Sequence, residues 1–103
     1  MAITSHESAN YIRVNFDGNG STGTTAWSGG RGAMIAQYVA GTGTITLEYT
    51  LDGGTTYNAV GSDTTITGAG GGVFNLPATT IRISATSTAS TPNINVSVGT
   101  VVG

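Results

Sequence analysis

The feature that most constrains the fold is a strict alternation of apolar and polar residues over 43–51, GTITLEYTL. The apolar residues of this run fall on one side of an extended chain, and three threonines and a glutamate fall on the other. Because successive side chains of a strand point to opposite faces, the spacing predicts a strand with one buried face. Asp-Gly-Gly follows at 52–54, and a second run, TTYNAV, occupies 55–60. Two such runs around Asp-Gly-Gly predict a β-hairpin.

The same period of two recurs along most of the chain, and it is interrupted by glycine, asparagine and proline. Further strands are expected at 10–16, 31–40, 63–67, 73–76, 79–87 and 93–102, with a flexible loop at 68–72. A short helix is the alternative for 31–40, but the flanking glycines and the valine and isoleucine content favour a strand. The sequence therefore predicts an all-β fold, a single antiparallel β-sandwich (jelly-roll or immunoglobulin-like) of about 7–9 short strands.

The 103 residues suffice for one domain. Residues 1–9 show no alternation, and we expect them to form a flexible, extended N-terminal arm. Residues 10–103 are expected to form the single β-sandwich domain.

The low content of charged residues limits the classes of molecule that the chain is expected to bind. Only 8% of the residues are charged, with three arginines, no lysine, five acids and a net charge of -2. Nucleic-acid binding requires clustered lysine and arginine, so we expect no nucleic-acid partner. No apolar run approaches the roughly 20 residues of a membrane span, so no membrane partner is expected either. A surface with few ions to desolvate favours close contact with copies of the chain or with other proteins.

The hairpin turn fits a known pattern. Its residues Thr50, Asp52, Gly54, Thr56 and Tyr57 match Ser/Thr-x-Asp-x-Gly-x-Thr-aromatic, which resembles the Asp box of sialidases and related propellers. In those families the box is a folding motif that lies away from the active site.

Each residue of the turn has an expected structural role. Asp52 should cap turn amides, Gly53 and Gly54 should adopt positive φ, and Tyr57 should anchor the return strand.

No set of residues with the spacing of a catalytic or metal site is found. The acids lie in the expected arm, at turns, or alone on a strand, so no carboxylate pair is implied. His6 is the single imidazole and there is no cysteine, which leaves no zinc ligand set. Asp17 with its neighbouring asparagines is a turn or, alternatively, a Ca²⁺ loop, and the turn is favoured. We therefore expect no catalytic residues, no metal and no cofactor, and a protein that is not an enzyme.

Five residues are candidates for an interface. Trp27, Arg31 and Tyr38 belong to the types enriched at the energetic centres of interfaces. For Trp27, closing one end of the sandwich is the favoured role and an interface or ligand platform is the alternative. His6 and Glu7 are included because an arm that folds across a neighbour would carry them.

Three stretches, taken in order, carry a resemblance to a family: GTITLEYTLDGGTTYNAV, GGGVFNLPATTIRISAT and TPNINVSVGTVV. Over roughly residues 30–103 the chain resembles small β-sandwich virion proteins of tailed bacteriophages, which are capsid decoration (cement) or appendage proteins. The resemblance implies a structural protein that binds the outer surface of the capsid non-covalently and reinforces the shell.

The resemblance also implies the partners. These are the major capsid protein and other copies of the chain, with a homotrimer favoured. The start of the chain lacks a basic region followed by an apolar one, so we expect no secretory signal and assembly on the virion within the host cytoplasm. The alternative is a head or tail appendage module that binds a carbohydrate or a host receptor through exposed rings of Tyr11, Trp27, Tyr38 or Tyr57.

Overall fold

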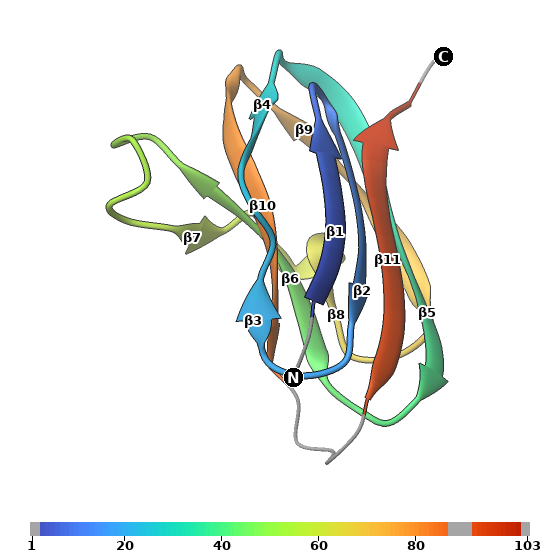
Figure 1. The fold of residues 1–103 in the computed structure, drawn as a ribbon. Helices are drawn as coiled ribbons and strands as arrows, with labels where there is room; N and C mark the ends of the chain where they lie inside the picture. The colour runs from blue at the N-terminus through green and yellow to red at the C-terminus, as the bar shows by residue number, and fades with distance from the viewer. Residues whose placement is uncertain (1–2, 87–91, 102–103) are drawn as a thin grey trace.

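A computed structural model describes residues 3–86 and 92–101 of the chain. Two antiparallel sheets pack face to face (Figure 1). The first has the strand order β1-β2-β11-β5-β9, and the second has β3-β10-β6-β7, with β4 paired to β10 and β8 paired to β6. The strands are β1 (Ile3–Ser8), β2 (Tyr11–Phe16), β3 (Gly20–Ser21), β4 (Thr25–Trp27), β5 (Gly30–Ala40), β6 (Thr44–Thr50), β7 (Asn58–Ala59), β8 (Thr65–Ile66), β9 (Gly70–Leu76), β10 (Thr79–Thr86) and β11 (Asn93–Thr100).

The all-β sandwich that the sequence predicts is confirmed. In the described part of the chain, seven strands are six residues or longer, and the other four have two or three residues. The helical alternative for 31–40 is wrong, because this segment lies within β5. Across residues 3–86 and 92–101 the helical content is a single 3₁₀ turn, η1 (Ser62–Thr64). No helix in the described ranges has the length and hydropathy needed to cross a membrane.

The core forms where the alternating apolar positions of the two sheets meet. Ile12 and Val14 of β2 face inwards from the first sheet, and Ile81 and Ile83 of β10 face them from the second. The fully buried side chains also include Phe16, Trp27, Met34, Ile45, Leu47, Ile94, Val96 and Val98. Burial of such side chains supplies the main favourable term in folding. The alternation read from the sequence therefore places the core residues correctly.

The expectation of a flexible N-terminal arm is corrected by the pairing of β1. Ile3–Ser8 form an edge strand whose register with β2 runs from Ile3 opposite Phe16 to Ser8 opposite Tyr11. Asn10 makes the tight turn possible with a left-handed φ of 61°. Its side-chain oxygen accepts hydrogen bonds from the Ser28 amide at 2.7 Å and the Ser28 hydroxyl at 3.1 Å. Backbone pairing, and not an apolar pattern, orders this strand.

The glycine-rich segment at 68–72 also differs from the expected loop. Gly70, Gly71 and Gly72 begin the edge strand β9 and pair with β5. A Cβ at Gly72 would lie 1.8 Å from the carbonyl oxygen of Asp63 in η1. The missing side chain therefore makes room for the backbone of η1, which packs against β9 between the two sheets.

Candidate functional site

The exposed face of the five-stranded sheet is the broadest surface that regular structure supports, and we call it the outer face. Its side chains alternate with the buried ones along each strand. The outer face comprises His6 of β1, Tyr11, Arg13 and Asn15 of β2, Asn93, Asn95 and Ser97 of β11, Arg31, Ala33, Ile35 and Gln37 of β5, and Val73 of β9. Three long central strands, β2, β11 and β5, hold most of these positions.

A row of side-chain amides crosses these three strands. The Asn15 amide nitrogen donates to the Oδ1 atoms of Asn93 and Asn95, both at 2.8 Å. The Asn95 amide nitrogen in turn donates to Gln37 Oε1 at 3.2 Å. The register explains the row, because Asn95 stands opposite both Asn15 and Gln37. These hydrogen bonds hold the amide side chains in one orientation, although the side chains lie on a solvent-exposed surface.

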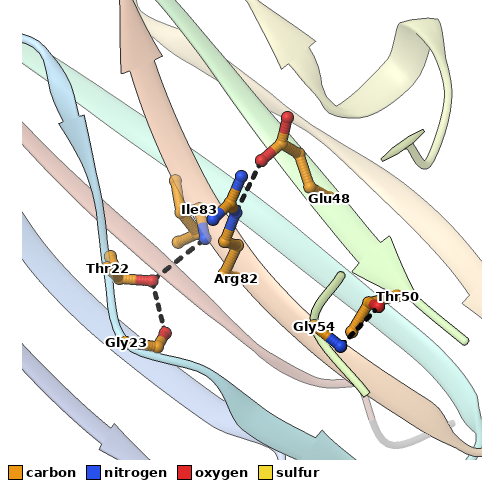
Figure 2. A network of polar contacts seen from close by, with 7 residues as sticks. All are labelled: Thr22, Gly23, Glu48, Thr50, Gly54, Arg82 and Ile83. Carbon is orange, nitrogen blue, oxygen red and sulfur yellow. Dashed lines mark hydrogen bonds and ion pairs between the residues drawn. The ribbon is translucent and has the colours of Figure 1, made fainter. Parts of the chain in front are cut away.

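The charges on the two sheets differ. Arg13 and Arg31 are exposed on the outer face, which carries no aspartate or glutamate. Across the strands Arg13 faces His6 and Ser97. Within residues 3–86 and 92–101 the ion pair lies on the other sheet, where Arg82 Nε is 2.8 Å from Glu48 Oε1 (Figure 2). The outer face is therefore weakly cationic, whereas the arginine of the second sheet is neutralised within the molecule.

Two shallow hollows lie side by side on the outer face. The first, which we call the polar hollow, has a volume of about 450 Å³ and is lined by Ser5, His6, Tyr11, Arg13, Asn15, Gln37 and Asn95. The second, the Ile35 hollow, has a volume of about 290 Å³ and is lined by Arg13, Ile35, Gln37, Asn95 and Ser97. Arg13 lines both hollows. Polar donors and acceptors thus stand next to an apolar side chain that solvent reaches.

Large apolar side chains are exposed at specific places. Ile35 is 62% exposed and Val73 is 53% exposed on the outer face, and Leu51 is 77% exposed in the loop between β6 and β7. Single exposed apolar residues are common on monomers. The relevant observation here is that Ile35 stands beside a hollow and that Leu51 stands on an ordered loop.

The loop between β6 and β7 is held by its own polar groups. The Thr50 hydroxyl donates to Asp52 Oδ1 at 2.8 Å. The same hydroxyl oxygen accepts from the Gly54 amide at 3.0 Å (Figure 2). Asp52 Oδ1 accepts the Thr56 amide at 2.9 Å. These bonds, with the Thr56 amide first, hold the pKa of Asp52 below its ordinary value. The carboxylate therefore remains ionised at neutral pH.

The glycines and the tyrosine of this turn complete the loop. Gly53 has a φ of 75° and Gly54 a φ of 97°, a region that favours glycine. The Tyr57 ring lies under the Arg82 guanidinium, whose carbon is 3.5 Å from the ring centroid. The return strand is shorter than the 55–60 expected, because only Asn58 and Ala59 pair with β6. The loop is fixed by hydrogen bonds and stacking more than by strand pairing.

Two of the aromatic interface candidates are engaged inside the fold. Trp27 is 1% exposed and packs on Phe74 with ring centroids 4.9 Å apart, so its expected alternative role in closing the core is the one observed, and the interface role is wrong. Tyr38 is half-buried, and its hydroxyl donates to the carbonyl oxygens of Gly43 at 2.7 Å and Ile66 at 3.1 Å. Partial burial raises the pKa of Tyr38. Neither ring offers an open platform.

The remaining candidates separate between the two sides of the first sheet. His6 is exposed on the outer face, and its ring makes an edge contact with Tyr11 at 6.2 Å. Glu7 is half-buried on the opposite side, because it pairs with inward-facing Ile12. Arg31 is exposed on β5 opposite Asn75. The structure thus brings His6 together with Tyr11 and Arg13, but not with Glu7, Trp27 or Tyr38.

Reading the sequence alone misses most of the outer face. Arg13, Asn15, Gln37 and Asn95 are far apart in the sequence, and Asn15 and Asn95 alone are separated by 80 positions. Their convergence depends on β11 pairing with both β2 and β5. The available signal was the polar half of each alternating run. In the described ranges, no three histidine, aspartate or glutamate side chains come together in a way that could hold a metal ion.

Comparisons with known proteins place the chain in no family. No protein-family model matches it, and no curated protein sequence matches it. Among solved structures it is similar to a chain in the structure of infectious bursal disease virus, Gx strain, with 13% identity and a TM-score of 0.42 over 96% of the present chain. The match covers 33% of that viral chain, so the present protein spans about a third of its length.

Proposed function

We propose that this chain is a non-catalytic structural protein of a tailed-bacteriophage virion, which binds the outer surface of the capsid as a decoration, or cement, protein. The observation that carries the proposal is the outer face, where an oriented amide row, Arg13 and exposed Ile35 lie on rigid strands. Protein interfaces combine apolar contact with hydrogen bonds and enriched arginine, and they contain few acids. The resemblance of residues 30–103 to phage virion proteins supports the same function.

A cement protein binds a shell in many copies, which would compensate for the small contact surface of each copy. A 103-residue module offers a contact area at the lower end of that of stable complexes. On a shell, many identical weak contacts act together, so that effective concentration raises the overall binding. The major capsid protein is the proposed partner, and the outer surface of the virion is the proposed location.

Addition of the purified chain to capsids that lack it tests the function. We expect saturable co-sedimentation at a fixed ratio to the major capsid protein and a higher temperature of shell opening. The variant Asn15→Asp, which changes the amide row outside the Ile35 hollow, should bind at least tenfold more weakly. The control Thr67→Asp places the same charge at an exposed position beside β8 and should bind like the wild type. Absence of capsid binding by the wild type at micromolar concentration would refute the proposal.

A second candidate function is favoured by the polar hollow. Tyr11 with His6, Arg13, Asn15 and Asn95 combines a ring with amide and cationic donors, which suits the hydroxyl groups of a sugar. In this case the chain is an appendage module that binds a host glycan. A glycan array and NMR titration of the wild type against Tyr11→Ala and Asn95→Ala test this candidate. Signals that shift only for the wild type would support it, whereas no binding on the array would remove it.

A further inference from the structure

The most exposed large apolar side chain in the described ranges lies at the end of a projecting loop. Leu51 is 77% exposed, and it precedes the ionised Asp52. The loop extends from β6 and β7 beyond the two layers, on the side away from β11 and β5 (Figure 1). We call residues 51–56 the hairpin tip. It presents an apolar side chain and a negative charge together.

The hairpin tip is pre-ordered. Asp52 and Thr50 bind each other and the amides of Gly54 and Thr56, and Tyr57 is held at the base of the tip by Arg82. A loop that is already ordered loses little conformational entropy on binding. Exposure of Leu51 on such a loop is therefore the arrangement of a docking element and not of a flexible turn.

The outer face of the same chain has the complementary features. The Ile35 hollow is lined by a 62% exposed isoleucine and, across β11, by Arg13, on a face without acids. Leu51 matches Ile35 in apolar character, and Asp52 matches Arg13 in charge. Opposite charges across an interface select the partner and its orientation. The tip extends from the six-stranded sheet, away from the outer face of its own molecule. It can therefore contact an outer face only on another copy of the chain.

We propose that the hairpin tip of one copy docks in the Ile35 hollow of a second copy, with Leu51 against Ile35 and Asp52 against Arg13. The contact joins two different surfaces and is therefore head-to-tail, which generates either a closed ring or a chain of copies. It deepens the proposed function and rests on it in one respect, since it assigns the Ile35 hollow to a neighbouring copy on the shell and leaves the polar hollow and the amide row of the outer face to the major capsid protein. A tip of this size buries less than a standard interface, so we expect association at micromolar or higher concentration.

Sedimentation of the purified chain without capsids tests the contact over a range from about 1 µM to about 1 mM, chosen to span weak association. We expect mass to increase with concentration towards a defined oligomer. Leu51→Asp and Ile35→Asp should each weaken association at least tenfold, while Thr67→Asp should leave it unchanged. All three positions are exposed, and circular dichroism with thermal unfolding verifies that each variant is folded.

A second test, a charge exchange, changes the charge on each side of the contact in turn, with Thr55→Lys in the hairpin tip and Arg13→Glu on the outer face, so that it does not depend on any single variant. Thr55 is exposed in the hairpin tip, so Thr55→Lys neutralises the tip without removing Asp52. This change should weaken association with the wild-type face. In the Arg13→Glu background, the same Thr55→Lys change should instead strengthen association, because the charge that it meets has been reversed.

The outcomes separate the two proposals. A chain that remains monomeric at about 1 mM, or whose association does not respond to Leu51, Ile35 and the charge exchange, overturns the head-to-tail contact. Capsid binding by such a chain would leave the decoration function intact. Association that shows the expected charge exchange, without any capsid binding, would support the contact and refute the decoration function.

Discussion

The Arg82 guanidinium lies 3.5 Å above the centre of the Tyr57 ring, and its Nε atom is 2.8 Å from Glu48. One side chain therefore joins β10 to β6 and to the base of the hairpin tip. Arginine presents both a planar face for stacking and N–H groups for a carboxylate, which lysine does not. This contact adds to the pairing of β7 with β6 in attaching the hairpin tip to the sheet.

The stacking contact should be measurable as a coupling. A double-mutant cycle with Arg82→Ala and Tyr57→Leu is expected to give an interaction free energy of about 0.5–1 kcal/mol for a partly exposed cation–π pair. Urea unfolding followed by Trp27 fluorescence provides the free energies. Strictly additive effects would show that the tip is held by its hydrogen bonds alone.

Gly72 should not accept a side chain. Alanine there would place its Cβ 1.8 Å from the Asp63 carbonyl oxygen, and this backbone atom can move only if η1 moves. We expect Gly72→Ala to lower the free energy of unfolding by about 1–3 kcal/mol, as overpacking does. Gly68→Ala is the matched control, because nothing lies within 4 Å of its Cβ, and it should be close to neutral. Equal effects at both glycines, measured by urea unfolding, would contradict the packing of η1 on β9.

Trp27 should contribute to the free energy of unfolding chiefly through the volume that its ring fills in the core. Its Nε1 atom is buried without a hydrogen-bond partner in the described part of the chain. Trp27→Ala should therefore cost about 3–5 kcal/mol through cavity formation, and Trp27→Phe should cost less than half as much because no hydrogen bond is lost. Thermal and urea unfolding followed by circular dichroism measures both. A loss for phenylalanine as large as the loss for alanine would contradict this, because it would show that the indole N–H, which both variants lack, contributes more than the volume of the ring.

Asp52 should make stability depend on pH in the acid range. Its folded-state pKa is lowered by the bonds from Thr56 and Thr50, so its stabilising contribution is present above its ordinary pKa of 3.8. The contribution is lost as pH falls through the lower folded-state value. The variant Asp52→Asn should therefore be less stable than the wild type at pH 7, and the difference should shrink below about pH 4. A difference that is constant between pH 7 and pH 3 in urea unfolding would mean that charge plays no part in the turn.

The sequence was informative where burial and strand alternation coincide. Ile81, Ile83 and Ala85 alternate with polar residues, and β10 is found over Thr79–Thr86 with those three inside. The Asp-Gly-Gly hairpin could also be predicted, because the turn depends only on residues that are neighbours in the sequence. In both cases the determining contacts are close in sequence.

The sequence was uninformative where pairing depends on distant strands. Residues 3–8 have no apolar pattern, and they form a strand because β2 offers a free edge. Gly70–Gly72 carry no side chains to show a period, yet β5 pairs with them. The hollows of the outer face arise in the same way, because Arg13 and Asn95 become neighbours only through the strand order.

That strand order also has a consequence for the timing of folding. β11 lies at the centre of the five-stranded sheet, between β2 and β5, although it follows all the other described strands in the sequence. During synthesis, β2 and β5 therefore leave the ribosome well before the strand that joins them, and the sheet closes only after residues 93–100 are available. Long-range pairing of this kind slows folding. The outer face should therefore form late in folding and all at once, because its three central strands come together only when β11 pairs.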